Sequence, residues 1–316
     1  MNSICYHVEN EDGRSGFLKA LDYSSAFDSD DQTRLLQSLL AAFNYERAIV
    51  DRCAKKSMSH VIRGLAFGDI RIDGFGPIIN QASYVIFEKA DSDSRAHLDT
   101  MNAFDEAWAL RALHNVAVGL NQLHGAGIAH QDLKPSNVLV MDRISKVGDV
   151  GRSAATDLNG PWDSNEIWGD HAYAPPEMLF GAPLADIPQS RRATDMYHLG
   201  SLILFFYTRV SATAALASEI DRRFWCGQWQ GTYAEVLPFV RAAFDLTAEA
   251  LGTSIVGPSR AELVEVFRQL CDPDPRLRGT RKAAPGSIAR YSLERFIAVL
   301  DRLARTAEIA LGRALS

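Results

Sequence analysis

The feature that most constrains this sequence is a polar run at residues 130–137, His-Gln-Asp-Leu-Lys-Pro-Ser-Asn. An amphipathic segment precedes the run and an apolar one follows it, which predicts a loop held between a helix and a short strand. Loops held in this way often carry function. The run places Asp132, Lys134 and Asn137 within six residues, and a second acid, Asp149, follows twelve residues after the asparagine.

These residue types suit phosphate chemistry. Asp132 can accept a proton, and Lys134 supplies a cation for a phosphate. Asn137 and Asp149 offer oxygen ligands suited to Mg²⁺. The order of the residues resembles the catalytic loop of the eukaryotic-type, or Hanks-type, protein kinases, His-Arg-Asp-Leu-Lys-x-x-Asn followed by Asp-Phe-Gly. The resemblance implies catalytic roles for Asp132 and Lys134. It also implies that Asn137 and Asp149 hold Mg²⁺ or Mn²⁺.

Composition argues against several classes of protein. The net charge of −6 and the lack of a basic stripe disfavour nucleic-acid binding. No secretory signal is visible at the start, and the longest apolar run, Leu199–Tyr207, is far shorter than the ~20 residues that span a bilayer. The four cysteines form no Cys-x-x-Cys pair, which fits reduced thiols and no structural zinc. We therefore expect a cytoplasmic protein that binds neither nucleic acid nor membrane.

The first segments resemble the smaller lobe of a kinase. Residues 3–8 and 16–21, separated by a turn, predict two strands, and the second strand carries Lys19. The resemblance makes Lys19 the lysine that binds the ATP phosphates. The alternative is a surface lysine on an edge strand.

An acidic, serine-rich turn at residues 24–31 precedes a helical pattern that runs through residues 35–53. Glu46 is the expected partner of Lys19, because apolar residues follow it at helical spacing. Asp51 is the competing candidate, although choosing it puts a lysine at a core position of the helix. An exposed helix carboxylate is the remaining interpretation of Glu46.

Strand-like runs at residues 61–67 and 84–87 lead into a segment that resembles the hinge between the two kinase lobes. The resemblance implies that the backbone of Glu88 and of Ala90 faces adenine. Leu139, in the apolar run after the catalytic loop, is assigned to the nucleotide site as well.

A helical pattern at residues 103–124 leads into the catalytic loop, so the larger lobe begins near its start. We expect a smaller lobe and hinge at residues 1–91 and a larger lobe at residues 92–316. The polar segment 151–170 resembles an activation loop, and an amphipathic helix at about residues 292–311 ends the chain.

The larger lobe contains further matches to the family. Tyr173 and Glu177 stand in a segment that resembles the closure of the activation loop, Tyr-x-Ala-Pro-Glu. Asp195 matches an aspartate that caps the catalytic-loop backbone in relatives. Arg278, in an Asp-Pro-x-x-Arg pattern, matches the arginine that pairs with the glutamate, here Glu177. The resemblance implies structural roles for these four residues.

The pattern is broken at several positions. No glycine-rich loop can be assigned before Lys19, so we expect a smaller lobe without its first strand and weaker ATP binding in a less enclosed site. Gln131 replaces an arginine that pairs with a phosphorylated activation loop in many relatives, and Val150 replaces the phenylalanine. Asp170 stands at a threonine position near Asp132, where a second acid would raise the proton affinity of Asp132 or repel phosphate.

The sequence therefore predicts an α+β, bilobal, protein-kinase-like fold with a shortened β-lobe and a mainly helical second lobe. The implied function is a bacterial-like, ATP- and Mg²⁺-dependent protein kinase. Its acceptors would be Ser or Thr hydroxyls of a protein substrate, because Lys134 is typical of Ser/Thr kinases. Two alternatives stay open: a pseudokinase that binds a nucleotide or acts as a scaffold, and a phosphotransferase that acts on a small molecule. Nothing in the sequence indicates the oligomeric state.

Overall fold

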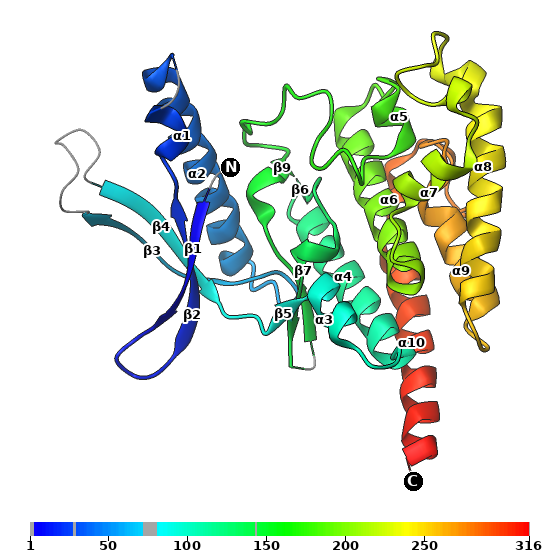
Figure 1. The fold of residues 1–316 in the computed structure, drawn as a ribbon, viewed down its shortest axis with the longest axis horizontal. Coiled ribbons are helices and arrows are strands. Elements are labelled where there is room, and N and C mark those ends of the chain that lie inside the picture. Colours follow the sequence, from blue (N-terminus) through cyan, green and yellow to red (C-terminus); the bar gives the residue numbers. More distant parts are fainter. Residues whose placement is uncertain (1–2, 28–29, 72–80, 143, 316) are drawn as a thin grey trace.

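The computed structural model describes residues 3–27, 30–71, 81–142 and 144–315. Figure 1 shows two parts. A small antiparallel sheet with one long helix beside it is drawn in blue and cyan, and a larger, mainly helical part runs from turquoise to red. This mixed architecture agrees with the predicted α+β fold class.

The N-terminal part consists of β1 (Ser3–Glu9), β2 (Ser15–Leu21), α1 (Ser24–Phe27), α2 (Gln32–Lys55), β3 (Gly64–Arg71) and β4 (Gln81–Glu88). The four described strands lie in the order β1-β2-β4-β3, and all neighbouring pairs are antiparallel. Lys19 lies in the middle of β2, opposite Cys5 on one side and Val85 on the other. Strands on both sides therefore fix the position of its backbone.

Two details of the predicted N-terminal part are wrong. Residues 24–27 form the short helix α1 where we expected a turn, and the carboxylate of Asp22 accepts a hydrogen bond from the first N–H of that helix. Strand β3 begins at Gly64 and not at residue 61. Ile62 instead donates its N–H to the carbonyl of Val147 at 2.8 Å, so this stretch leaves the sheet and joins it to the helical part.

Helix α2 begins after Asp31, whose carboxylate accepts a hydrogen bond from the N–H of Arg34. Its apolar side, which includes Ile49 and Val50, is buried in the core of the protein. Glu46 shares that buried side and is only 1% exposed. A carboxylate in such a position requires a partner, because an isolated buried charge is costly.

The larger part consists of β5 (Ser92–Asp93), α3 (Ser94–Thr100), α4 (Glu106–Gly125), β6 (Ile128–Ala129), η1 (Pro135–Asn137), β7 (Val138–Met141), β8 (Ile144–Val147), η2 (Val150–Arg152), β9 (Ala154–Ala155), α5 (Pro176–Leu179), α6 (Ile187–Thr208), α7 (Ala212–Glu219), η3 (Arg222–Phe224), α8 (Tyr233–Ser254), α9 (Arg260–Leu270), η4 (Ile288–Tyr291) and α10 (Glu294–Leu315), where η marks a short 3₁₀ turn. Strand β7 pairs with β5 and β8, and β6 pairs with β9. Helix α10 packs along α4 (Figure 1). The helices predicted near residues 103–124 and 292–311 are therefore confirmed, with small shifts at their ends.

The apolar run at residues 199–207 lies inside α6, and most of it is buried. Among the described residues, no single helix is both long and apolar enough to cross a membrane. Helices α6 and α7, which are bent by 76° at their junction, meet that criterion only when they are taken together.

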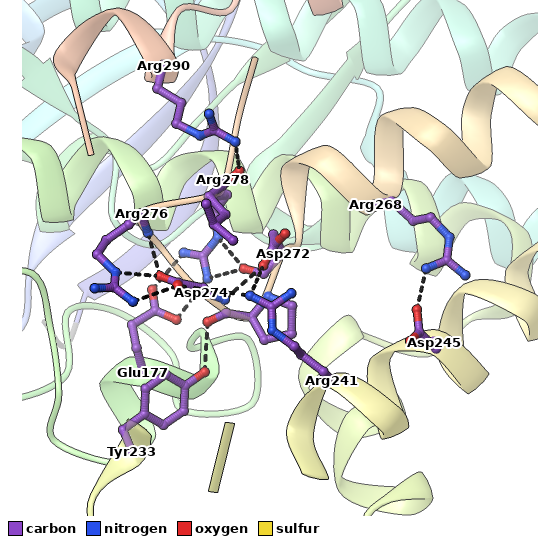
Figure 2. A network of polar contacts seen from close by, with 12 residues as sticks. Glu177, Tyr233, Arg241, Asp245, Arg268, Asp272, Asp274, Arg276, Arg278 and Arg290 are labelled. Atoms are coloured by element: carbon purple, nitrogen blue, oxygen red, sulfur yellow. Dashed lines mark hydrogen bonds and ion pairs between the residues drawn. The ribbon is translucent and has the colours of Figure 1, made fainter. Parts of the chain in front are cut away.

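A fully buried ion pair joins α5 to the segment that precedes η4. Arg278 donates to the two carboxylate oxygens of Glu177 at 2.6 and 2.8 Å (Figure 2). The same guanidinium also donates to the carbonyls of Asp272 and Ala193, so all five of its N–H groups have an acceptor. The pair therefore fixes the end of the polar segment 151–170 against the core.

Candidate active site

A cavity of about 480 Å³ opens between the sheet and the helical part. Lys19 and Phe87 line it from the sheet, and Glu46 lines it from α2. Leu139 of β7 and Asp149, just before η2, line it from the helical part. A concave, partly apolar site of this size, with a few convergent polar groups, is typical of a small-molecule site.

Lys19 is held between two carboxylates. Its Nζ atom donates hydrogen bonds to Oε1 of Glu46 at 2.8 Å and to Oδ1 of Asp149 at 3.1 Å. Asp51, the competing candidate, pairs instead with Lys55 one helical turn later on the surface of α2. The fold thus brings together three charged residues from three distant segments of the chain.

Charge coupling decides the ionisation of this cluster. Burial acts to lower the pKa of Lys19, but the carboxylates of Asp149 and Glu46 hold that pKa above its usual value. Burial raises the pKa of Glu46 despite its bond to Lys19. Burial acts in the same direction on Asp149, yet the Lys19 ammonium outweighs it and keeps the pKa of Asp149 below its usual value. The Asp149 carboxylate is therefore ionised, and 47% of its side chain is open to solvent.

Asn137 supplies a second oxygen beside the cavity. Its Nδ2 atom donates to the carbonyl of Asp132 at 2.8 Å, and no described residue donates to its Oδ1 atom. Asp149 likewise keeps one carboxylate oxygen free. These two oxygens fit Mg²⁺, which usually takes one or two protein ligands and completes its shell with phosphates and water. In the described part of the chain, no three His, Cys, Asp or Glu side chains gather as a metal site.

The loop that carries Asp132 is fixed by the fully buried Asp195 of α6. The carboxylate of Asp195 accepts hydrogen bonds from the N–H of His130 at 2.7 Å and from the N–H of Gln131 at 2.8 Å. It also contacts Nε2 of His124 at 2.8 Å. Burial acts to raise the pKa of Asp195, but these partners hold the pKa below its usual value. Asp195 thus acts as a rigid anchor for the loop.

Lys134 lies between Asp132 and Asp170. Its Nζ atom is 3.5 Å from Oδ2 of Asp132 and 3.1 Å from Oδ2 of Asp170. Burial acts to lower the pKa of Lys134, but Asp132 and Asp170 raise it overall. We had expected Asp170 to act on Asp132, whereas its carboxylate is bonded to the lysine. Oδ1 of Asp132 is buried and has no hydrogen-bond partner among the described residues.

The hinge candidates also line the cavity. The N–H of Glu88 donates to the carbonyl of Arg63 at 3.0 Å, and its side chain pairs with Lys146 at 2.6 Å. No described residue forms a hydrogen bond with the N–H or C=O of Ala90, which leaves both groups open to a ligand. Leu139 of β7 contributes an apolar side chain to the same cavity.

Gln131 and Tyr173 fasten the surrounding segments to the helical part. Nε2 of Gln131 donates to the carbonyl of Arg191 in α6 at 2.8 Å, so this side chain points toward the helix. The hydroxyl of Tyr173 accepts a hydrogen bond from Arg95 at 2.8 Å. The first contact ties the loop that carries Asp132 to α6, and the second ties Tyr173, just after the segment 151–170, to α3.

Two residues that sequence reasoning missed also line the cavity. Arg152 ends η2, and Trp162 lies ten residues later. The indole N–H of Trp162 donates to the carbonyl of Gly151 at 2.9 Å, and the guanidinium of Arg152 lies 5.4 Å from the ring centre. The sequence carried a weak signal, because the mainly polar segment 151–170 contains two tryptophans, Trp162 and Trp168, and side chains of this size are usually well buried on average.

Comparison with known proteins gives the family. A family model described as "Protein kinase domain" matches residues 46–285. The serine/threonine-protein kinase AfsK of Streptomyces coelicolor is 37% identical over 93 residues, which are 29% of this chain and 11% of that protein. The Wee1-like protein kinase of Oryza sativa subsp. japonica is 35% identical over 95 residues, 30% of this chain and 16% of that protein.

A longer match covers more of the chain at lower identity. The cyclin-dependent kinase F-3 of Oryza sativa subsp. japonica is 26% identical over 211 residues, 64% of this chain and 47% of that protein. The chain therefore spans less than half of the length of each of these relatives. The family model, in contrast, covers most of the chain, from Glu46 to beyond Arg278. The two-part architecture is accordingly the bilobal kinase fold, and the chain belongs to the protein kinase family.

Proposed function

We propose that this chain is an ATP- and Mg²⁺-dependent protein kinase that transfers a γ-phosphate to Ser or Thr hydroxyls. The observation that carries the proposal is the joining of Lys19, Glu46 and Asp149 beside Asn137 at one cavity. Phosphoryl transfer needs mainly positioning and charge neutralisation. A fixed cation, an ionised carboxylate and a free amide oxygen meet those needs.

Each candidate residue has a role under this proposal. Lys19, oriented by Glu46, binds the α- and β-phosphates. Asn137 and Asp149 would hold Mg²⁺ or Mn²⁺, which would supply positive charge to offset that of the phosphates. The open N–H and C=O groups of Ala90, together with the backbone of Glu88, face adenine. Leu139 packs against the nucleotide.

Asp132 and Lys134 act on the acceptor side. The buried, unpartnered Oδ1 of Asp132 supports a role in accepting a hydrogen bond or proton from the substrate hydroxyl. Lys134 offsets charge on the phosphoryl group. Lys134, placed two residues after the aspartate, favours a Ser/Thr hydroxyl in a protein substrate, and the similarity to AfsK, a serine/threonine-protein kinase, agrees with that.

Other features of the chain follow from the same proposal. We take residues 1–91 and 92–316 as the two lobes, which the pairing of β5 with β7 supports. Tyr173, Glu177, Asp195 and Arg278 serve the structure through the contacts described above. The four free cysteines fit a cytoplasmic location. The net charge of −6 argues against a nucleic-acid substrate.

One observation favours a second candidate, a pseudokinase that binds a nucleotide or a partner protein. Asp170 is bonded to Lys134 at 3.1 Å and competes with a phosphoryl group for that cation. If this contact persisted when a nucleotide is bound, Lys134 would not offset charge during transfer. Loss of transfer with retained nucleotide binding would distinguish this candidate from the first.

The experiment is transfer of labelled γ-phosphate from ATP, with Mg²⁺ or Mn²⁺, to the protein itself and to a generic basic protein. Wild type is compared with Asp132→Ala and Asp149→Ala. Asp99→Ala is the matched control, since this carboxylate is 68% exposed and lies outside the cavity. We expect label in wild type and in Asp99→Ala and none in the other two. Equal label in all four folded proteins, or none in any, would contradict the proposal.

A further inference from the structure

Arg152 differs from Lys19, the other cation that lines the cavity, in having no carboxylate partner among the described residues. It lies three residues after Asp149, at the end of η2, and it is half-buried. Within the described residues, no carboxylate oxygen lies within 4.0 Å of its guanidinium. In the described part of the chain, its guanidinium makes one hydrogen bond, from Nη1 to the carbonyl of Gly169 at 3.1 Å. Most of its five N–H donors are therefore free.

The two cations of the cavity can be compared directly. Lys19 is bonded to Glu46 and Asp149, so its charge is offset by two carboxylates. Arg152 lies against the face of Trp162, which holds its guanidinium without neutralising it. The charge of Arg152 reaches Asp170 and lowers the pKa of that acid, but Asp170 is bonded to Lys134. Arg152 is thus the cation with the most unused capacity at this site.

The surroundings of Arg152 indicate which part of a nucleotide it meets. On one side lies Asp149, the candidate metal ligand in the same cavity. On the other side lies Gly169, the acceptor of its hydrogen bond. Gly169 abuts Asp132 so closely that an added Cβ atom would stand 3.0 Å from Oδ1 of Asp132. Arg152 therefore shares the cavity with the candidate metal ligand and is linked through Gly169 to Asp132, the candidate residue on the acceptor side.

From these contacts we propose that Arg152 forms a subsite for the terminal phosphate of the nucleotide. The proposal rests on the function proposed above and adds a residue to it. Guanidinium groups bind phosphate oxygens with paired, charge-assisted hydrogen bonds.

Binding measurements test this proposal without any phosphoryl transfer. The dissociation constants of ADP and of a non-hydrolysable ATP analogue are measured by titration calorimetry with Mg²⁺, for wild type, Arg152→Gln and Arg152→Lys. Arg152→Gln is expected to weaken binding of the ATP analogue about ten- to hundredfold, because one charge-assisted contact is lost. Binding of ADP should change less than about twofold, since the missing contact is with the terminal phosphate alone.

Arg52→Gln is the matched control. Arg52 contacts the same polar segment through Asp157 at 2.7 Å, but it does not line the cavity. It should leave both dissociation constants unchanged, and Arg152→Lys should fall between wild type and Arg152→Gln. An equal loss for ADP and the ATP analogue, or no loss for either, would overturn the subsite. Wild type that binds neither nucleotide would overturn the proposed function along with it.

Trp162 offers an independent readout. If the terminal phosphate draws the guanidinium away from the indole ring, intrinsic fluorescence changes with the ATP analogue and not with ADP. The change should vanish in Trp162→Phe, which keeps an aromatic face under Arg152, and in Arg152→Gln. An identical fluorescence change with both nucleotides in wild type would contradict the assignment to the terminal phosphate.

Discussion

The Glu177–Arg278 pair and the Lys19–Asp149 pair each join segments more than a hundred residues apart, but they differ in their exposure to solvent. The side chains of Glu177 and Arg278 are 2% and 0% exposed. Those of Lys19 and Asp149 are 17% and 47% exposed and face a cavity. In the closed pair every donor of the arginine is used. In the open pair a carboxylate oxygen stays available.

This difference separates two uses of charge in one fold. A closed pair with all its hydrogen bonds made can only hold the chain together, since no ligand reaches it. An open pair contributes less to stability because water screens it. Its free oxygen, however, can bind an ion or orient a ligand. We therefore expect changes at the Glu177–Arg278 pair to alter stability, and changes at the Lys19–Asp149 pair and its surroundings to alter ligand binding or phosphoryl transfer.

The largest expected effect comes from removing one partner of the buried Glu177–Arg278 pair. Arg278→Met leaves the carboxylate of Glu177 buried without a partner, and we expect the free energy of unfolding to fall by ~3–5 kcal/mol. Arg276→Met is the control, because that guanidinium is 65% exposed and pairs with Asp274. It should cost less than ~1 kcal/mol. Urea titrations of both variants supply the comparison, and similar losses would contradict the closed character of the Arg278 site.

The next effect is the pH dependence of the free energy of unfolding. His198, fully buried on α6, has no partner at either ring nitrogen among the described residues. Burial lowers its pKa from 6.5 to about 4. Between pH 6.5 and pH 4, His198 is protonated in the unfolded chain but stays neutral in the folded protein. Stability is therefore lost as pH falls from 6.5 to 4, by about 3 kcal/mol for this residue.

The check is the free energy of unfolding as a function of pH for wild type and His198→Phe. The difference between the two curves should grow steadily from pH 6.5 down to pH 4 and then level off. Parallel curves over that range would show that protons reach His198 in the folded protein. The core beside Asp195 would then not be closed.

The smallest expected effect is on the rate of phosphoryl transfer and concerns the partly exposed Asp170. Asp170→Asn removes the charge that competes for Lys134, and we expect phosphoryl transfer to rise up to about fivefold. The gain is modest because the Asp170 side chain is 37% exposed and screened. Asp157→Asn, at a neighbouring exposed acid bonded to Arg52, should change the rate less than twofold. A lower rate in Asp170→Asn would mean that this acid orients Lys134 for transfer.

Local patterns were sufficient to predict much of the fold. Helical spacing gave α2, α4 and α10 to within a few residues, because apolar side chains at that spacing must face a core. The same reasoning chose Glu46 over Asp51, and the structure pairs Glu46 with Lys19. It failed at residues 61–62, where a strand-like pair leaves the sheet to bond with β8. Apolar pattern alone cannot tell a strand in a sheet from an extended segment packed on another part.

Besides the Lys19–Glu46 pair, the sequence could indicate candidate site residues only where single residues match the spacing of a known motif. Asp132, Asn137 and Asp149 stand out by type and spacing. The partners of Asp170 and Arg152 depend on how the segment 151–170 folds back over the loop, and a polar segment has no periodicity that fixes its path. Tertiary contact decided both cases: Asp170 bonds Lys134, and Arg152 packs on Trp162.

The most direct test of the account is the Mg²⁺ dependence of ATP binding in two variants, one from each pair. The dissociation constant of ATP is measured with and without Mg²⁺ for wild type, Asp149→Asn and Glu177→Gln, at a temperature where all three are folded. We predict that Mg²⁺ tightens binding in wild type and in Glu177→Gln and has no effect in Asp149→Asn. If Mg²⁺ tightens binding equally in Asp149→Asn, the open carboxylate does not hold the ion, and the central claim is wrong.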